Sequence, residues 1–245
     1  MENNSQSPNT KLFLLILILA DILWIFTYIN RPSEEIPPQN QNIIFSEIIH
    51  GDRNKKQLIF TFDGGGDSVS TEKILEVLKK HNVKGTFFLT GKFIEDNPDI
   101  VRKISAEGNE IFNHTYNHPH LTTLNKEEII SELNNTDEIL RRTIGVSTKP
   151  YFRAPFGDRN TFVLKIASEA GYRSVYWTID ALDWEEGIEG GKSAEDVKNI
   201  ILNNVYPGNI YLMHLGDNIT GNILDSVFSI LEEQGYKIVS LTQGL

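Results

Sequence analysis

The chain has 245 residues, a formal net charge of −10 and no cysteine. The acidic balance argues against a nucleic-acid-binding protein, because phosphate binding needs a basic surface. The lack of cysteine excludes a disulfide scaffold, a thiolate metal site and a cysteine nucleophile.

The N-terminal segment is the most apolar part of the sequence. Residues 12–29 read LFLLILILADILWIFTYI, with Asp21 as the single charge, and about 17–25 apolar residues are needed to span a bilayer. A cleaved signal peptide is the alternative, but no A-x-A-like cleavage site follows. The segment therefore predicts a transmembrane signal anchor at 1–30. The Pro-, Gln- and Asn-rich residues 31–44 predict a flexible tether.

Residues 45–245 alternate between apolar runs typical of strands and amphipathic segments typical of helices. This alternation predicts parallel β/α units in one domain, as a closed or partly closed barrel or as an open doubly wound sheet. The expected strands are 58–62, 86–90, 110–114, 151–155, 172–179, 210–214 and 237–241. The expected helices are 71–80, 98–107, 126–142, 161–170, 194–203 and 223–234.

Polar side chains gather at the C-terminal ends of these expected strands. Asp63 ends the first strand, His114 the third, Asp180 the fifth and His214 the sixth, while Arg153 lies in the fourth. Catalytic groups of β/α barrels lie at that end of the strands. The placement therefore predicts one active site shared by five strands.

The spacing of the histidines narrows the chemistry. His114 and His118 are four residues apart, so their imidazoles can converge if the backbone turns helically. With a carboxylate they would form a 2-His-1-carboxylate set suited to zinc or another divalent first-row ion. A His-rich surface loop is the alternative interpretation, and His120 is expected at the rim. Glycines 64–66 allow close approach of a ligand, but the segment lacks the motifs of nucleotide-binding loops.

The chain resembles the NodB-homology polysaccharide deacetylases, carbohydrate esterase family 4. Five motifs appear in family order over residues 57–215, and this resemblance implies an α/β fold, a distorted (β/α) barrel of about seven β/α units. The motifs are TFDGGGD at 61–67, HTYNH at 114–118, RAPF at 153–156, DALDW at 180–184 and LMH at 212–214.

The resemblance also implies catalytic roles. Asp63 would be the general base that activates a metal-bound water, and His114 and His118 would hold the metal. Arg153 would orient Asp63 and keep it ionised. His214 would be the general acid that protonates the leaving amine.

The remaining motif residues would support catalysis and binding. Asp180 would pair with His214 and hold it protonated. The backbone N–H of Phe156 would help to stabilise the oxyanion. Trp184 and Leu212 would form the apolar wall that receives the acetyl methyl group.

The first motif departs from the family pattern. The usual sequence is Thr-Phe-Asp-Asp-Gly, whose second Asp completes the metal site, and this chain has Gly64 at that position. We predict that Asp67 replaces it as the third ligand. The alternative is that Asp67 caps the helix that begins near Ser70.

These observations predict a metal-dependent hydrolase of carbon–nitrogen bonds that removes N-acetyl groups from an amino-sugar polymer such as peptidoglycan. Zinc is the expected ion, with cobalt or another first-row ion as the alternative. The anchor and tether predict a single-pass protein of the cell membrane with its catalytic domain, 45–245, on the extracellular side. The alternatives are an O-acetyl polysaccharide esterase, a degenerate glycan-binding protein, favoured by Gly64, and a hydrolase of small non-sugar amides.

Overall fold

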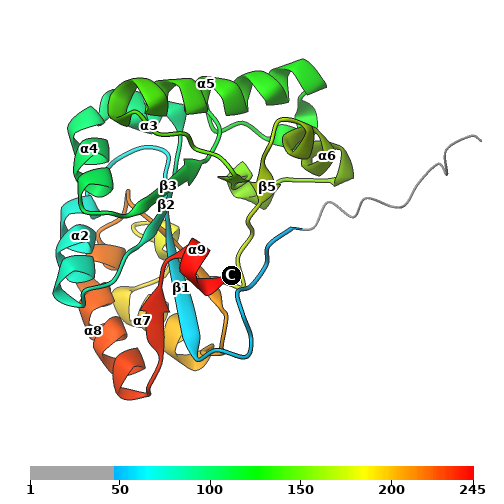
Figure 1. Cartoon of the computed structure of the whole chain (residues 1–245). Helices are drawn as coiled ribbons and strands as arrows, with labels where there is room; N and C mark the ends of the chain where they lie inside the picture. Colours follow the sequence, from blue (N-terminus) through cyan, green and yellow to red (C-terminus); the bar gives the residue numbers. More distant parts are fainter. Residues whose placement is uncertain (1–46) are drawn as a thin grey trace, which may run out of the picture. The chain divides into compact units, whose positions relative to one another are not determined.

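Parallel strands form one curled sheet in the computed structural model, which describes residues 47–245 (Figure 1). The strand order is β5-β4-β3-β2-β1-β7-β6, and β8 pairs with the first half of β1. The strands are β1 (Gln57–Gly64), β2 (Thr86–Leu89), β3 (Glu110–Asn113), β4 (Tyr151–Phe152), β5 (Arg173–Ser174), β6 (Ile179–Asp180), β7 (Ile210–His214) and β8 (Lys237–Val239).

The two ends of the sheet, β5 and β6, do not pair with each other, so the barrel is only partly closed. The predicted distorted (β/α) barrel is thereby confirmed. The predicted single strand at 172–179 is wrong, because its middle leaves the sheet. The backbone N–H of Tyr176 donates to the Ile48 carbonyl at 2.7 Å, and that of Thr178 donates to the Ile210 carbonyl at 2.8 Å.

All six predicted helices are present, and α8 begins four residues earlier than expected. The short helices α3 and α9 were not predicted. Thr90 was assigned to a strand, but its side chain instead caps α3 by accepting from the Phe93 N–H. The helices are α2 (Thr71–Lys80), α3 (Gly91–Asp96), α4 (Pro98–Ala106), α5 (Lys126–Ile144), α6 (Thr161–Glu169), α7 (Ala194–Asn203), α8 (Ile219–Glu233) and α9 (Leu241–Gly244). Three 3-10 turns complete them: η1 (Leu121–Thr123), η2 (Pro155–Gly157) and η3 (Asp183–Glu185).

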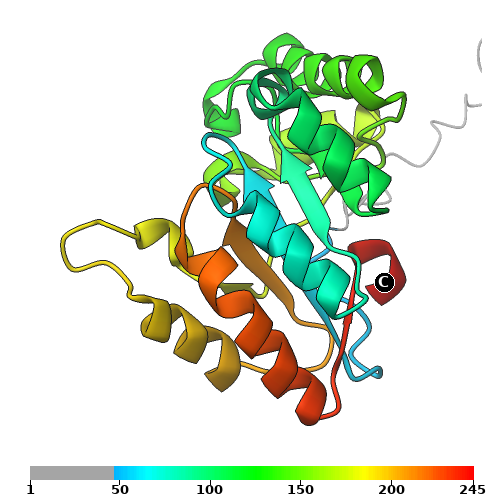
Figure 2. The same cartoon turned by 90° about the vertical axis from the view of Figure 1, so that its left-hand side faces the viewer.

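The alternation of side chains along β1 decides which residues reach the site. Successive side chains of a strand lie on opposite faces of the sheet. Phe60 and Phe62 belong to the core under the helices, where Phe60 stacks on Tyr211 with ring centroids 4.6 Å apart. Helices α2, α8 and α7 lie side by side over this core (Figure 2). Thr61 and Asp63 therefore lie on the opposite face, inside the curled sheet.

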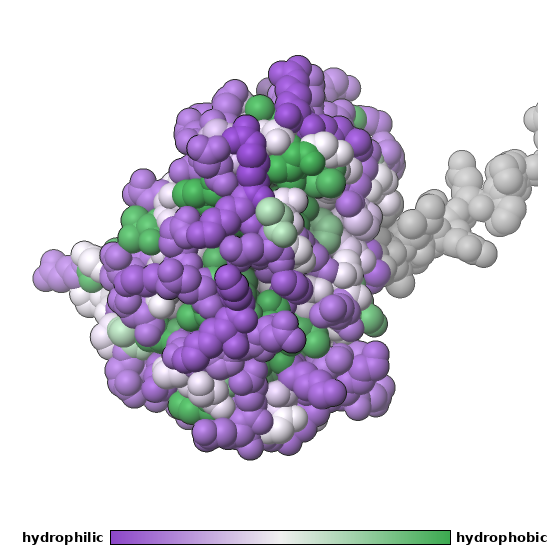
Figure 3. All heavy atoms as spheres, turned by 60° about the vertical axis from the view of Figure 1, so that its left-hand side comes forward, coloured by the Kyte–Doolittle hydropathy of each residue, from purple (hydrophilic) through white to green (hydrophobic). Residues whose placement is uncertain are grey.

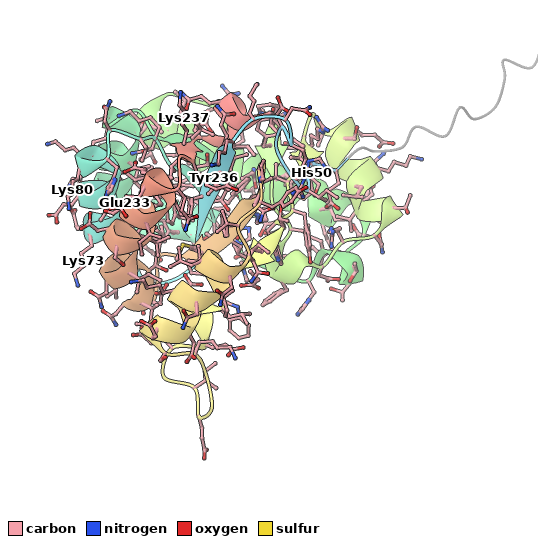
Figure 4. All side chains as sticks on the ribbon, turned by 90° about the horizontal axis from the view of Figure 1, so that it is seen from below. His50, Lys73, Lys80, Glu233, Tyr236 and Lys237 are labelled. Atoms are coloured by element: carbon pink, nitrogen blue, oxygen red, sulfur yellow. The ribbon has the colours of Figure 1, made fainter. Side chains whose placement is uncertain are left out.

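The face of the domain drawn in Figure 3 is largely hydrophilic, and its apolar residues form small, separate patches. This pattern is what amphipathic helices around a sheet produce, with the apolar stripe turned to the core. The loop between η3 and α7 projects from the rest of the domain (Figures 2 and 4).

The predicted membrane localisation is corrected. Within residues 47–245 no helix is both long and apolar enough to cross a membrane; the 19-residue α5, for example, reads KEEIISELNNTDEILRRTI and is strongly charged. The described residues thus give no support to the single-pass localisation with an extracellular catalytic domain or to the membrane as a partner, and neither is proposed below. The segment 12–29, the predicted anchor 1–30 and the tether 31–44 lie outside the described residues.

Candidate active site

The carboxyl end of β1 presents Asp63, which is 5% exposed. The fully buried Arg153, just after β4, donates from Nη1 to Asp63 Oδ1 at 2.6 Å and to Thr61 Oγ1 at 2.9 Å. The guanidinium also lies over the Phe88 ring, 4.2 Å from its centroid. A charge-assisted hydrogen bond in a dry environment is strong. Arg153 therefore fixes the Asp63 carboxylate and leaves its second oxygen, Oδ2, facing His114.

His114 follows β3 and turns one ring nitrogen toward Asp63. Its Nδ1 lies 3.0 Å from the Arg153 carbonyl oxygen. Because a carbonyl only accepts hydrogen bonds, we assign the ring proton to Nδ1, which leaves a lone pair on Nε2. Nε2 lies 3.5 Å from Asp63 Oδ2. Burial lowers the pKa of His114, so the ring stays neutral and keeps its Nε2 lone pair available to a metal.

His118 reaches the same place by an irregular turn and not by the helical turn that its spacing suggested. Thr115 and His118 both have positive φ, 67° and 61°. The Glu132 carboxylate holds the turn by accepting from the backbone N–H groups of residues 116 and 117 at 2.8 and 2.7 Å. The ring centroids of His114 and His118 are 4.9 Å apart. Burial, followed by the neighbouring His114, lowers the pKa of His118 to about 4.

Two neutral imidazoles beside a carboxylate suit a divalent first-row ion. The third protein ligand is not in place: within residues 47–245 no three His, Asp or Glu side chains are grouped to hold a metal. A side chain at position 64 would meet Leu89 and Leu215 at 2.8 and 2.9 Å, so apolar atoms occupy that space. Asp67 is exposed, and α2 begins without a side-chain cap. Asp67 as a ligand stays a prediction, and its capping alternative is not observed.

His214, at the end of β7, is paired with Asp183 and not with the predicted Asp180. The fully buried Asp183 places Oδ1 2.8 Å from His214 Nδ1, and its Oδ2 accepts from the His214 backbone N–H at 2.7 Å. Asp180 instead accepts from the backbone N–H of Leu182 at 2.9 Å. Leu182, between the two carboxylates, has a positive φ of 59° and leads into η3. Sequence reasoning missed Asp183, although it is the second carboxylate of the same motif.

The carboxylates around His214 keep its ring charged. Burial disfavours the charge, but the hydrogen bond and negative charge of Asp183, followed by Asp63 and Asp180, outweigh it and raise the pKa of His214 to about 9. The ring is therefore protonated at neutral pH. The register of β1 and β7 pairs Asp63 with His214. An ionisable carboxylate and an imidazolium thus stand at the same level on adjacent strands.

Two exposed rings lie beside other residues of the site: Phe156 contacts the His118 ring, and Trp184 follows Asp183 in the chain. Phe156, in η2, is 61% exposed and has a positive φ of 58°. His120 stacks on it at 4.2 Å, which places His120 at the rim as predicted. Trp184, in η3, is 49% exposed, whereas Leu212 of β7 is buried. Two of the predicted substrate-binding residues are thus exposed rings, the third is buried in the sheet, and their binding role stays a prediction.

Comparison with known proteins gives concordant similarities. Residues 50–175 match the family model described as polysaccharide deacetylase. A peptidoglycan-N-acetylglucosamine deacetylase of Bacillus cereus is 40% identical over 201 residues, 80% of this chain and 71% of that protein. The peptidoglycan-N-acetylmuramic acid deacetylase PdaA of Bacillus subtilis is 36% identical over 191 residues, 78% of this chain and 72% of that protein.

Solved structures are similar over the same region. The structure of PdaA, described as a family 4 carbohydrate esterase, is 34% identical with a TM-score of 0.77, covering 82% of this chain and 85% of that one. A protein of Bacillus anthracis described as a CE4 family pseudoenzyme is 31% identical with a TM-score of 0.76, covering 81% of this chain and 68% of that one.

Proposed function

The chain belongs to the polysaccharide deacetylase family, carbohydrate esterase family 4, and from this premise we propose that it hydrolyses N-acetyl groups of a cell-wall glycan such as peptidoglycan. The reaction is hydrolysis of a carbon–nitrogen bond that is not a peptide bond. The observation that carries the proposal is the pairing of Asp63, fixed by Arg153, with a protonated His214 on the adjacent strand. We assign the catalytic domain to 45–245.

The two side chains supply the two proton transfers of amide hydrolysis. Asp63 accepts a proton from the attacking water as the water oxygen bonds to the acetyl carbon. His214 donates its Nε2 proton to the sugar nitrogen as the carbon–nitrogen bond breaks, so that acetate and a free amine result. Asp183 holds the ring by Nδ1, which leaves Nε2 as the donor. Each transfer is worth about 10²–10⁴-fold in rate.

The proposed metal is zinc, with cobalt or another first-row ion as the alternative, and His114 and His118 would hold it. When bound, the ion would supply positive charge that polarises the acetyl carbonyl and lowers the pKa of water. The neutral state of both rings at pH 7 supports this assignment. Leu212 and Trp184 would receive the acetyl methyl group, and the Phe156 N–H would stabilise the oxyanion.

The direct test is acetate release. The purified protein is incubated with N-acetylglucosamine oligomers and with purified peptidoglycan, before and after treatment with EDTA and after zinc or cobalt is restored. We expect acetate and free amine in equal amounts, loss of turnover with EDTA and recovery with the ion. Absence of acetate from every substrate would overturn the activity, and turnover that ignores the chelator would overturn the metal assignment.

The pH dependence tests the role of Asp183. A general acid acts while it is protonated, so the rate falls as pH rises through its pKa, near 9 for His214. D183N removes the negative partner, and the His214 pKa should return toward the ordinary value of about 6.5. The alkaline limb of kcat against pH should therefore move down by about two units. An unchanged limb in a folded D183N protein would contradict this role.

Metal content tests the third ligand. If Asp67 completes the site, D67A should bind zinc at least about tenfold more weakly than the wild type, because a two-histidine site holds the ion poorly. Zinc is measured by elemental analysis and by competition with a chromogenic chelator, without reference to activity. Asp99, an exposed carboxylate paired with Arg102 on α4, provides the control variant D99A. Equal zinc affinity in D67A and D99A would exclude Asp67.

The glycan-binding alternative has one observation in its favour. Gly64 replaces the second Asp of the family motif, and the side chains of Leu89 and Leu215 occupy the space that a side chain at position 64 would need. One structural relative is described as a pseudoenzyme. A catalytically degenerate protein would show glycan binding but no zinc binding in calorimetry, and it would release no acetate. The same acetate assay therefore separates the two functions.

A further inference from the structure

A buried carboxylate outside the five motifs lies behind the general acid. Asp217, between β7 and α8, is 5% exposed. Its Oδ1 accepts from the Thr220 N–H at 2.7 Å, whereas its buried Oδ2 has no hydrogen-bond partner among residues 47–245. An unpartnered oxygen of this kind is costly. We therefore expect the Asp217 carboxylate to make a contribution that offsets this cost.

Thr220 connects this carboxylate to the catalytic pair. Its N–H donates to Asp217, and its hydroxyl donates to Asp183 Oδ2. The same Asp183 oxygen accepts from the His214 N–H, and the other contacts the His214 ring. An unbroken chain of hydrogen bonds thus runs from Asp217 through Thr220 and Asp183 to His214.

The backbone around Asp217 is anchored from a separate element. The Ser70 hydroxyl, just before α2, donates to the Asp217 carbonyl and accepts from the Gly221 N–H at 3.1 Å. Asn218 gives α8 no side-chain cap, so the Asp217 carboxylate satisfies one of the first free N–H groups of that helix. The hydroxyl of the same Thr220 then makes the link to Asp183, so the cap and the catalytic pair share one residue.

The charges around Asp217 favour its neutral form. Burial and the Asp183 carboxylate raise the pKa of Asp217 to about 7. Asp183 and His214 are the titratable groups that face it, and Asp63 and Asp180 act further on His214. Two further charged side chains, one on the projecting loop and one on α2, form hydrogen bonds with other residues. Glu186, on the projecting loop, bonds Asn218, and Lys73, on α2 (Figure 4), bonds Asn222.

We propose that Asp217 is a positioning residue for the general acid: through Thr220 it holds Asp183 against His214, and it thereby keeps the His214 ring oriented and protonated. This inference rests on the proposed deacetylation. The hydrogen bonds lead from Asp217 to His214 by way of Thr220 and Asp183, so the effect of Asp217 passes through the geometry of Asp183.

The test combines kinetics with a titration that needs no turnover. In D217A, kcat at pH 6 should fall about tenfold with KM within about twofold, because a displaced acid slows only the chemical step. The His214 pKa, followed by NMR of histidine-labelled full-length protein and assigned with H214Q, should fall by about one unit. D217N keeps an acceptor for Thr220 and is neutral like the acid it replaces, so it should retain kcat at pH 6 within about twofold.

Thr220 gives a second route to the same result. T220V keeps the N–H that donates to Asp217 but loses the hydroxyl that donates to Asp183. It should therefore show the same fall in kcat and in the His214 pKa as D217A, whereas T220S should keep the wild-type kcat and pKa. The matched control is T86V. Thr86 is also buried and also donates its hydroxyl to a carboxylate, Glu110 at 2.8 Å, but it begins β2 at the far end from the site. T86V should lose stability without moving the His214 pKa.

The outcomes are separable. A D217A or T220V protein with wild-type kcat and an unchanged His214 pKa overturns the inference, as does a D217N protein that loses as much as D217A at pH 6. If D217A does not fold, T220V against T220S decides. If the wild type releases no acetate, the proposed function fails, and the His214 pKa of the variants still decides the positioning role.

Discussion

D63N is expected to lower kcat for deacetylation by about 10³-fold, within the range of a lost general base, with little change in KM. Asparagine has the shape of aspartate, and its side-chain oxygen can still accept from Arg153 Nη1, which donates to Asp63 Oδ1 at 2.6 Å. The amide, however, cannot take a proton from water. The loss should therefore appear in the chemical step alone, measured as initial rates of acetate release at saturating glycan.

The control for D63N is D137N. Asp137 on α5 also accepts from an arginine, Arg141 at 2.7 Å, and from the Ser147 hydroxyl at 2.6 Å, but none of these contacts belongs to the site. D137N should keep kcat within about twofold once the folded fraction is measured by denaturant titration. Wild-type turnover in folded D63N would remove Asp63 from the role of base.

The regular part of this fold could be predicted from local sequence. Capping boxes at Asn125 with Glu128 and at Ser193 with Asp196 fix the starts of α5 and α7 at the predicted residues. The segment 172–179 could not be predicted, because its path depends on Ile48, more than a hundred residues earlier in the chain. Local apolar pattern cannot distinguish a strand in the sheet from an extended segment that leaves it.

The site shows the same division between local and distant information. The motifs identified Asp63, Arg153 and the histidines, because strand ends of parallel β/α units converge at one edge. The partner of His214 was misassigned, because the sequence alone does not distinguish Asp180 from Asp183, two carboxylates of the same motif three residues apart. The positive φ of Leu182 directs Asp183 to the ring. Asp217 could not be found from the motifs, since its importance depends on which group the Thr220 hydroxyl reaches.

The dependence of the rate on His214 should differ between hydrolysis of an amide and hydrolysis of an ester. H214Q is expected to lower kcat on an N-acetyl substrate by about 10³-fold. On an O-acetylated glycan or an activated acetate ester the loss should be below about tenfold, because an alcohol or phenol leaves with less protonation than an amine. The measurement is acetate release from both substrate classes at pH 7, where the His214 ring, with a pKa near 9, supplies the proton.

The H214Q rates on the N-acetyl and the O-acetyl substrates distinguish three possible roles of this active site. The control variant is H81Q. The His81 ring lies between Asp225 and Glu232, both on α8, at 2.9 Å from each, so H81Q should affect turnover of neither substrate. Equal losses on amide and ester would mean that His214 stabilises the site without donating a proton to the leaving group. A wild type that cleaves only the ester would make the protein an O-acetyl esterase. A selective loss on the amide assigns the second proton transfer to His214, because only the amine depends on it to leave.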